Sequence, residues 1–243
     1  MSLKSSSDKS NHRAVNEGMP SSLQKLIAGL GLVVASPILA GCAAAVACSS
    51  KGPILFRQQR MGRNGKAFTL YKFRTMADSN TGPKVTVKGD PRITSIGKIL
   101  RKSKLDELPE LWNVVNGTMA LVGPRPEAVE YVDLNKELWN TVLLARPGIT
   151  DPVTINLRNE EELLAAVDGA REDFYKSTLQ PYKLLGYRDY LFERTCLSDF
   201  QVLVKTVMVV LNPGMANPPN RERVEEVVQK YLDCASTASH IDK

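Results

Sequence analysis

The sequence predicts a mainly helical α/β fold: a re-entrant membrane helix-hairpin, then a small compact cytoplasmic domain with a short β-hairpin and amphipathic interfacial helices. Three observations support this prediction. The chain has 243 residues, of which 43% are hydrophobic, so it can bury a core. Residues 26–50 carry no charge, which suits a helix in a bilayer. The rest combines two strand-like runs with long stretches of helical apolar periodicity.

Composition divides the chain into four segments. Residues 1–20 are polar, rich in Ser and Asn and without periodicity, which is typical of a disordered leader. The membrane hairpin is expected at residues 21–50 and the main domain at residues 51–214. A helix and a polar tail complete the chain at residues 215–243.

The apolar run contains a Ser-Pro pair, Ser36-Pro37, near its middle. Proline removes a backbone hydrogen bond and clashes with the preceding turn, so the helix is expected to kink or break there. Each half is too short to cross a bilayer. Lys25 and Lys51 flank the run, so the positive-inside rule gives no asymmetry and both ends can face the cytoplasm. A re-entrant hairpin fits these observations; a kinked transmembrane helix and a buried soluble hairpin are the alternatives.

The residues after the apolar run predict a basic β-hairpin. Ile54–Gln58 and Ala67–Phe73 have the composition of strands. A turn at Gly62–Gly65 joins them, and its Asn-Gly pair is typical of hairpin turns.

Two helices are expected to follow the hairpin. The segment "DPRITSIGKILRKSKL" predicts an amphipathic helix with Ile96, Ile99 and Leu100 on one face. Pro109 is well placed to open the second helix, because proline suits the first helical turn.

Beyond these helices, Arg125 lies in a rigid turn, because Pro124 and Pro126 restrict the backbone on both sides of it. The segment Asp199–Leu211 is apolar with a single lysine and predicts a core helix or a helix in the membrane interface. Further helical patterns, separated by polar loops, cover residues 129–144, 160–180, 183–195 and 221–232.

Charge is unevenly distributed along the chain. The net charge is +6, and residues 51–104 hold fourteen Lys or Arg against two Asp. Such a segment is expected to meet an anionic partner, whether a phosphate, a nucleotide or a lipid headgroup. Nucleic acid is not indicated, because helix-turn-helix and zinc-finger patterns are missing from this sequence. The four cysteines include no CxxC pair, so neither a zinc site nor a disulfide framework is predicted.

The stretch "KSKLDELPELWNVVNG" sets Asp106, Glu107 and Glu110 close to a group of cations. Capping of the following helix is one interpretation of the first two acids. Phosphoryl transfer is the other, because it needs carboxylates for Mg²⁺, a nucleophile, and cations that take up charge on the phosphate oxygens. Arginine binds phosphate bidentately and lysine supplies a point charge. The candidate cations are Lys72, Arg74, Arg101 and Arg125.

Three motifs in this order, "FRQQRMGRNGKAFTLYKFRTM", "DPRITSIGKILRKSKLDELPELWNVVNG" and "LVGPRPE", resemble the bacterial sugar transferases that act on polyprenyl phosphate, the monotopic phosphoglycosyl transferases. The resemblance runs from about residue 26 to residue 150, with a weaker match near Asp199 and Thr206. It implies a re-entrant helix broken at a Ser-Pro pair, as at Ser36-Pro37.

The resemblance implies a reaction. Such enzymes move a sugar 1-phosphate from a nucleotide diphosphate sugar, usually a UDP-sugar, to a polyprenyl phosphate, with Mg²⁺, at the cytoplasmic face of the bacterial inner membrane. The products are a polyprenyl diphosphate sugar and UMP. The acceptor expected here is undecaprenyl phosphate or a close relative, and the step would initiate a cell-surface glycan such as an exopolysaccharide or a lipopolysaccharide.

The resemblance also implies residue roles. Asp106 is the expected nucleophile, which forms a covalent phosphosugar intermediate, and Glu107 is its partner; both are expected at the Mg²⁺ site. Residues 51–214 would be the catalytic domain. The expected substrate-binding residues are Gln58, Arg60, Lys72, Arg74, Arg101, Pro124 and Arg125.

This sequence departs from the family pattern at several positions. Gln24 stands near a usual aspartate, and Lys25 alone replaces a usual Lys-Arg pair. Glu110 replaces glutamine, Ala120 a frequent serine, and Asp151 a typical glycine. The catalytic pair is intact, so these positions are expected to alter anchoring or substrate preference.

The expected partners are a UDP-sugar, a polyprenyl phosphate and membrane lipids, with a homodimer as an open alternative and no nucleic acid. A second hypothesis is a membrane-docked scaffold of the same fold that has lost activity and binds acidic phospholipids through its basic hairpin. The replacement Asp106→Asn separates the two hypotheses, because it would leave a scaffold's function intact.

Overall fold

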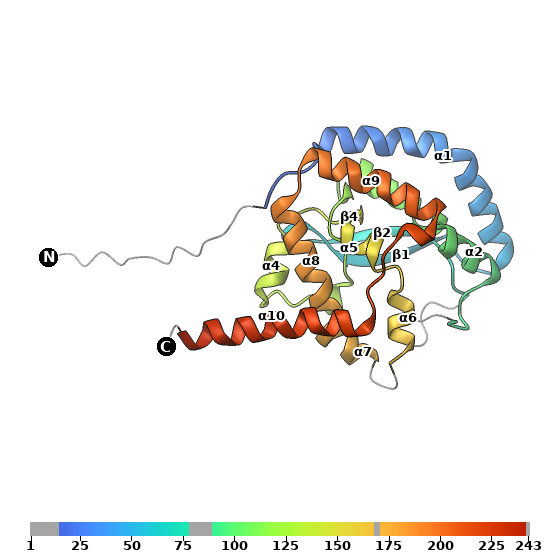
Figure 1. The fold of residues 1–243 in the computed structure, drawn as a ribbon. Coiled ribbons are helices and arrows are strands. Elements are labelled where there is room, and N and C mark those ends of the chain that lie inside the picture. Colours follow the sequence, from blue (N-terminus) through green and yellow to red (C-terminus); the bar gives the residue numbers. More distant parts are fainter. Residues whose placement is uncertain (1–14, 78–88, 168–170, 242–243) are drawn as a thin grey trace.

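The structure is mainly helical, as the sequence predicts, and it contains two small sheets (Figure 1). The computed structural model describes residues 15–77, 89–167 and 171–241. Strands β1 (Leu55–Met61) and β2 (Ala67–Phe73) pair in antiparallel orientation. The short strands β3 (Ala120–Val122) and β4 (Gly148–Thr150) pair in parallel orientation, which periodicity alone does not predict for three-residue strands.

The β-hairpin confirms the expected second strand, while the first begins one residue later and continues to Met61, past its predicted end. The pairing register sets Leu55 opposite Phe73 and Met61 opposite Ala67. Asn64 and Gly65 have positive φ angles of 57° and 70°, which the Asn-Gly pair tolerates. This turn brings the basic strand β2 back along the molecule.

Helix α1 (Ser21–Ser49) is one continuous helix, bent sharply in Figure 1, with Pro37 inside it. The kink is therefore present, but the two separate half-helices of the expected hairpin are not. The Ser36 hydroxyl donates a 2.8 Å hydrogen bond to the Val33 carbonyl near the proline. By length and composition α1 can cross a membrane, and its middle is exposed, with Val33 at 72% and Val34 at 79%.

Both ends of α1 are fixed to the same body. At the first end the Gln24 amide donates to the Met19 carbonyl at 2.7 Å and accepts from the Leu121 N–H of β3 at 2.7 Å. At the other end Arg74 donates to the carbonyls of Ser50, at 2.6 Å, and Pro53. Gln24 thus replaces the usual aspartate with an amide that both donates and accepts.

Helices α2 (Ser95–Ser103) and α3 (Glu110–Val115) confirm the two helices expected after the hairpin. Thr94 caps α2 through a 2.9 Å hydrogen bond from the Gly97 N–H. Leu100 is buried, but Ile99 is 61% exposed, so the two do not share a buried face as expected.

The predicted helix at residues 129–144 is interrupted. It is a 3₁₀ turn at Val129–Tyr131 followed by α4 (Glu137–Val142). The Asp133 carboxylate accepts from the Asn135 N–H at 3.0 Å, a local bond that competes with the helix. The other helices are α5 (Pro152–Asn156), α6 (Glu160–Ala165), α7 (Arg171–Phe174), α8 (Gln180–Glu193), α9 (Cys196–Leu211) and α10 (Arg221–Ile241).

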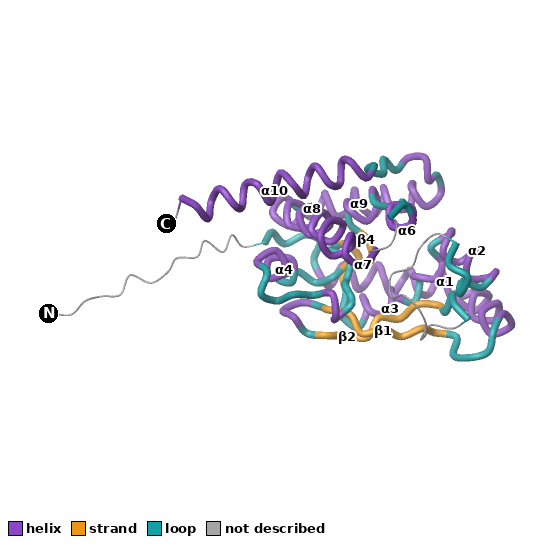
Figure 2. Tube along the Cα trace, turned by 90° about the horizontal axis from the view of Figure 1, so that it is seen from below, coloured by secondary structure: helices purple, strands orange, loops and turns teal. Residues whose placement is uncertain are grey.

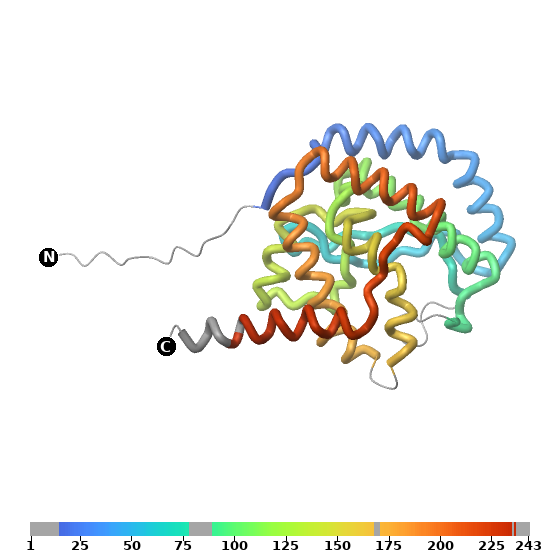
Figure 3. The backbone as a smooth tube through the Cα atoms, viewed as in Figure 1, coloured from blue at the N-terminus to red at the C-terminus, as the bar shows by residue number. Residues whose placement is uncertain are grey.

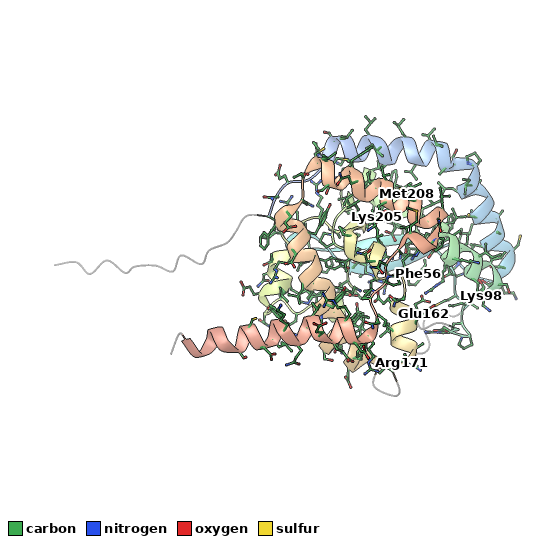
Figure 4. All side chains as sticks on the ribbon, in the orientation of Figure 1. Phe56, Lys98, Glu162, Arg171, Lys205 and Met208 are labelled. Atoms are coloured by element: carbon green, nitrogen blue, oxygen red, sulfur yellow. The ribbon has the colours of Figure 1, made fainter. Side chains whose placement is uncertain are left out.

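Helices α9 and α10 complete the surface. α9 and α1 occupy the upper edge of the molecule in Figure 1, while α10 runs along the lower edge in the tube of Figure 3. α9 buries Val202 and Val209 and exposes Leu197, Phe200 and Leu211, so it is both a core helix and an apolar surface. Figure 4 labels Lys205 and Met208 on this helix. α10 extends to Ile241, beyond the predicted end at residue 232.

The last residues of the predicted leader are folded. The Asn16 N–H donates to the Leu191 carbonyl at 3.0 Å, and the Met19 N–H donates to the Asp199 carboxylate at 2.7 Å. A Cβ on Gly18 would lie 2.0 Å from that carboxylate, so the close approach requires glycine. The leader prediction of residues 1–20 is thus too long, and residues 1–14 lie outside the described residues.

One apolar cluster joins the β-hairpin to the rest of the fold. Phe68 and Leu70 of β2 pack in the same cluster as Val114 of α3, Met119 and Val122. Figure 2 shows the two long strands along one side of the molecule, with α3 next to them. This packing holds β2 beside α3 and so determines where the polar side chains of both elements meet.

Candidate active site

The backbone between α2 and α3 brings three acids together. Lys104 ends α2 in the left-handed conformation, with φ of 59°, and a 3₁₀ turn at Leu105–Glu107 follows. Asp106 and Glu107 lie on that turn, and Glu110 lies in the first turn of α3. Glu107 and Glu110 both lie next to Lys72 of strand β2, and Glu107 also contacts Arg125 of the loop after β3.

Glu107 is surrounded by cations. Arg125 binds it bidentately, with N–O distances of 2.5 Å and 3.3 Å. The ammonium of Lys72 lies 3.3 Å away and that of Lys104 3.7 Å away. Burial by itself would raise the pKa of Glu107, but Arg125, with Lys104 and Lys72, holds this pKa well below its ordinary value. Glu107 is therefore an anion that organises the cations around it.

Lys72 links Glu107 to Glu110. Its ammonium lies 3.1 Å from Glu110, whose side chain is 1% exposed. Burial raises the pKa of Glu110, and the positive charge of Lys72 opposes that shift. Both partners are held inside the protein, so Lys72 is fixed at this point of the site.

Asp106 differs from Glu107 and Glu110 because it forms no ion pair among the described residues. Its side chain is 7% exposed, and its Oδ1 atom has no hydrogen-bond partner among the described residues. Burial, reinforced by the charge of Glu107, raises the pKa of Asp106, while Lys72, Lys104 and Arg101 oppose the shift. A buried carboxylate oxygen without a partner is costly, so its retention points to a ligand or a reaction.

The structure brings together part of the predicted site. Asp106, Glu107, Lys72 and Arg125 form one cluster, and Arg101 is near enough for its charge to act on Asp106 although it pairs with Glu161. We call Lys72, Asp106, Glu107, Glu110 and Arg125 the Asp106 cluster.

The other predicted residues lie elsewhere. Arg74 lies outside the cluster and donates to the carbonyls of Ser50 and Pro53, so its predicted role in substrate binding stays a prediction. Gln58 accepts a 3.0 Å hydrogen bond from Arg60. Pro124 is buried, and its carbonyl accepts from the Gly148 N–H at 2.8 Å, which holds the turn before Arg125. Ser36-Pro37 belong to the bend of α1.

A second ionic cluster was not predicted. Glu127 accepts from the Tyr175 hydroxyl and lies 3.4 Å from Arg60 and 3.9 Å from Lys183. Lys183 in turn lies 3.2 Å from Glu160. Glu127 directly follows the Pro-Arg-Pro turn, but Tyr175 is 48 positions further along the chain, so local patterns give no signal for their contact. We call these residues the Glu127 cluster.

Asp151, which replaces a glycine of the family pattern, has a structural function. Its carboxylate caps α5 by accepting from the N–H groups of Val153, at 2.7 Å, and Thr154, at 2.9 Å. The side chain is fully buried, and burial raises its pKa although these hydrogen bonds oppose the shift. An effect on substrate preference, which the sequence suggested, therefore stays a prediction.

The Asp106 cluster fits a metal that is shared with a substrate. No group of three or more metal-ligating side chains is found among the described residues, so these side chains alone do not build a metal cage. Mg²⁺ commonly takes one or two carboxylates and completes its coordination with waters and substrate phosphates. The orphaned oxygen of Asp106 is the donor that such a metal needs. Fixed cations and a partly unpaired carboxylate are the groups that phosphate chemistry requires.

Comparison with known proteins agrees with this class of site. The bacterial sugar transferase family profile matches residues 16–213, so the chain belongs to the bacterial sugar transferase family.

Several relatives are named UDP-glucose:undecaprenyl-phosphate glucose-1-phosphate transferase, among them proteins of Klebsiella pneumoniae and Xanthomonas campestris pv. campestris. That of Klebsiella pneumoniae is 41% identical over 149 residues, which cover 59% of this chain and 32% of the relative. That of Xanthomonas campestris pv. campestris is 34% identical over 216 residues, which cover 86% of this chain and 41% of the relative. A third relative, from Aeromonas hydrophila, is named UDP-N-acetylgalactosamine-undecaprenyl-phosphate N-acetylgalactosaminephosphotransferase. It is 37% identical over 130 residues, which cover 51% of this chain and 31% of the relative. The matches thus span about a third to two fifths of these relatives.

Proposed function

We propose that the protein is a phosphoglycosyl transferase, which transfers a sugar 1-phosphate from a UDP-sugar to a polyprenyl phosphate such as undecaprenyl phosphate. The observation that carries the proposal is the buried Oδ1 atom of Asp106, which has no partner among the described residues and lies beside fixed cations. The names of the relatives support the substrate classes. Because those names include both glucose and N-acetylgalactosamine donors, the sugar itself is left to experiment.

The proposed reaction has two displacements. In the first, a carboxylate oxygen of Asp106 attacks the phosphorus next to the sugar, and the bond from this phosphorus to the bridging oxygen breaks, releasing UMP. In the second, a phosphate oxygen of the polyprenyl phosphate attacks the same phosphorus and releases Asp106. A covalent intermediate lets the nucleotide leave before the bulky lipid reacts. The product is a polyprenyl diphosphate sugar.

Arg125 and Lys72 would stabilise the charge that develops on the phosphate oxygens. Glu107 holds both cations in place before the substrate arrives, and such preorganised charges are most effective in a buried site. Glu107 is therefore a positioning residue in this proposal.

Asp106 is the proposed Mg²⁺ ligand of the chain. Glu107 was expected to share this role, but three cations surround its carboxylate, which supports Asp106 as the better ligand. When bound, Mg²⁺ would offset negative charge on the diphosphate. It would also lower the cost of keeping the Asp106 carboxylate ionised in a buried site.

The proposed location is the cytoplasmic face of the bacterial inner membrane, with α1 as a re-entrant anchor. A helix of 29 residues is about 44 Å long if straight, enough to place its ends on opposite sides of a bilayer. Here Gln24 and Arg74 hold its two ends to one folded body. This double attachment and the bend support an anchor that enters and returns. The product would start a cell-surface glycan, and a homodimer stays a prediction.

The test is nucleotide release by the detergent-solubilised full chain with polyprenyl phosphate, Mg²⁺ and a panel of UDP-sugars. Wild type is expected to release UMP with one or a few donors, and Asp106→Asn is expected to release none. Release of UDP would contradict the proposal, because it indicates ordinary glycosyl transfer. Equal UMP release by Asp106→Asn would exclude the covalent intermediate on that residue. An inactive scaffold predicts no release from any donor, but nothing in a scaffold requires the unpaired oxygen of Asp106.

A further inference from the structure

A basic pocket lies at the start of α1, apart from the Asp106 cluster. It has a volume of about 200 Å³. Four of its lining residues are cations from four separate parts of the chain: Lys25, Arg63, Arg146 and Arg194. Glu17 is the one acid in the lining, and no member of either ionic cluster is included. Tertiary folding thus collects positive charge at a place where local sequence shows only Lys25.

These cations differ from those of the two ionic clusters in their partners. Arg146 donates to the Ser21 hydroxyl at 2.5 Å, Arg194 to the Asn16 carbonyl at 2.6 Å, and Arg63 to the Leu144 carbonyl at 2.9 Å. Those acceptors are neutral, and no ion pair joins any of the four cations to an acid within the described part of the chain. Their positive charge is therefore held in position but not neutralised.

The backbone adds to this charge. Ser21, Gln24 and Lys25 of the lining belong to the first turns of α1, a helix of 29 residues. No side chain caps this end of the helix. Uncapped N–H groups and the helix dipole favour an anion here. Fixed cations and a helix N-terminus thus point to the same class of ligand.

The position of the pocket identifies the source of the anion. Leu26 and Ile27 follow Lys25 directly, and Leu197 follows Arg194 by three positions; all three are exposed apolar side chains. Positive charge bordering exposed apolar surface matches the boundary between phosphate headgroups and acyl chains. The volume also argues against a nucleotide sugar, since pockets for such ligands are commonly about 300–1,000 Å³.

We infer that this pocket binds the phosphate headgroup of an anionic phospholipid of the bilayer. The bound lipid would fix the depth of the first turns of α1, because the pocket is shared between α1 and the body. The cations that the start of α1 lacks in sequence are supplied by Arg63, Arg146 and Arg194. This binding site does not depend on the transfer reaction.

The test is native mass spectrometry of the full chain in a neutral detergent, with phosphatidylglycerol or phosphatidylcholine added. Wild type is expected to retain phosphatidylglycerol at least tenfold more than phosphatidylcholine. The double variant Arg146→Gln/Arg194→Gln is expected to lose this preference. The matched control Lys51→Gln/Lys230→Gln removes the same charge outside the pocket and is expected to keep it.

A second variant separates lipid binding from folding. Among the described residues, none accepts a hydrogen bond from the Lys25 ammonium. The replacement Lys25→Gln therefore removes a positive charge from the pocket without breaking a hydrogen bond. It is expected to reduce phosphatidylglycerol retention by about fivefold or more. Retention equal to that of wild type in both Lys25→Gln and the double variant would overturn the proposal.

A third arm identifies the anion source. Inorganic phosphate at millimolar concentration is expected to leave phosphatidylglycerol bound. Complete displacement would overturn the lipid assignment and show a site for free phosphate. The variant Asp106→Asn is expected to retain the lipid like wild type, so loss of transfer activity and loss of lipid binding are distinguishable.

Discussion

The two buried ionic clusters differ in how completely their carboxylate oxygens are paired. In the Glu127 cluster both oxygens of Glu127 have partners: one faces Arg60 and the Ala128 N–H, the other Tyr175 and Lys183. In the Asp106 cluster one oxygen of Asp106 has no hydrogen-bond partner within the described residues. A buried carboxylate whose two oxygens both have partners stabilises the fold. A buried carboxylate with an unpaired oxygen carries an energetic cost, which a role in the reaction would explain.

The largest expected effect is on activity. Asp106→Asn removes the proposed nucleophile with little change in shape and is expected to lower UMP release by at least about 10³-fold. Glu127→Gln is expected to change the rate by less than about tenfold, because that cluster lies outside the reacting groups. Initial rates of UMP formation at saturating donor measure both. Similar losses in the two variants would remove the functional distinction between the clusters.

The next effect is on stability. Glu127→Gln leaves Lys183 and Arg60 less well compensated in a buried position and is expected to lower the free energy of unfolding by about 2–3 kcal/mol. Glu226→Gln, which breaks an exposed pair with Arg223, is expected to cost less than about 1 kcal/mol. Urea unfolding in detergent, followed by circular dichroism, compares them. Equal costs would show that the Glu127 cluster contributes no more than a surface pair.

A smaller effect is expected at Asp151, a buried acid whose partners are neutral. Asp151→Ala removes the cap of α5 and is expected to cost about 1 kcal/mol. Asp151→Asn keeps an oxygen for the same N–H groups and is expected to cost less. Thermal unfolding of the two variants checks the order. A larger loss for the asparagine would mean that the negative charge, rather than the cap, is the important feature.

The last prediction concerns pH and the direction of a small change. Because burial raises the pKa of Asp106 above 3.8, its ionised form is disfavoured in the folded protein. The cost is fully present above the raised pKa and disappears as pH falls below the ordinary value, where both folded and unfolded states are protonated. Without Mg²⁺, Asp106→Asn is therefore expected to unfold at a higher temperature than wild type at pH 7, with the difference shrinking toward pH 3.5. A less stable variant at pH 7 would contradict an energetic cost at Asp106.

Local sequence patterns predicted the helices and strands whose formation depends on residues close together in the chain. The Asn-Gly turn predicted the β-hairpin, apolar spacing predicted α2, and Pro109 predicted the start of α3. The acids on the turn between α2 and α3 could be identified because chain proximity already places them together. The bend of α1 followed from Pro37, but the continuity of the helix through this proline did not.

Long-range contacts account for the parts of the site that the sequence did not predict. Arginines in the basic hairpin all look like phosphate ligands, yet Arg74 reaches carbonyls beyond α1, and Arg60 joins Glu127. The Glu127 cluster depends on Tyr175 and Lys183, which only the tertiary fold brings near the Pro-Arg-Pro turn. Residue type indicates what a side chain can bind, whereas packing determines which partner it meets.

The attachment of α1 has a consequence for synthesis of the chain. The bond that fixes its first end, from Leu121 to Gln24, joins residues 97 positions apart. At roughly 5–20 residues per second, the helix is complete several seconds before its docking strand is made. During that interval the apolar helix is available to the lipid or to a chaperone while its polar attachment points do not yet exist. With the proposed membrane anchor, the chain is therefore expected to insert α1 first and to close its fold against the helix afterwards.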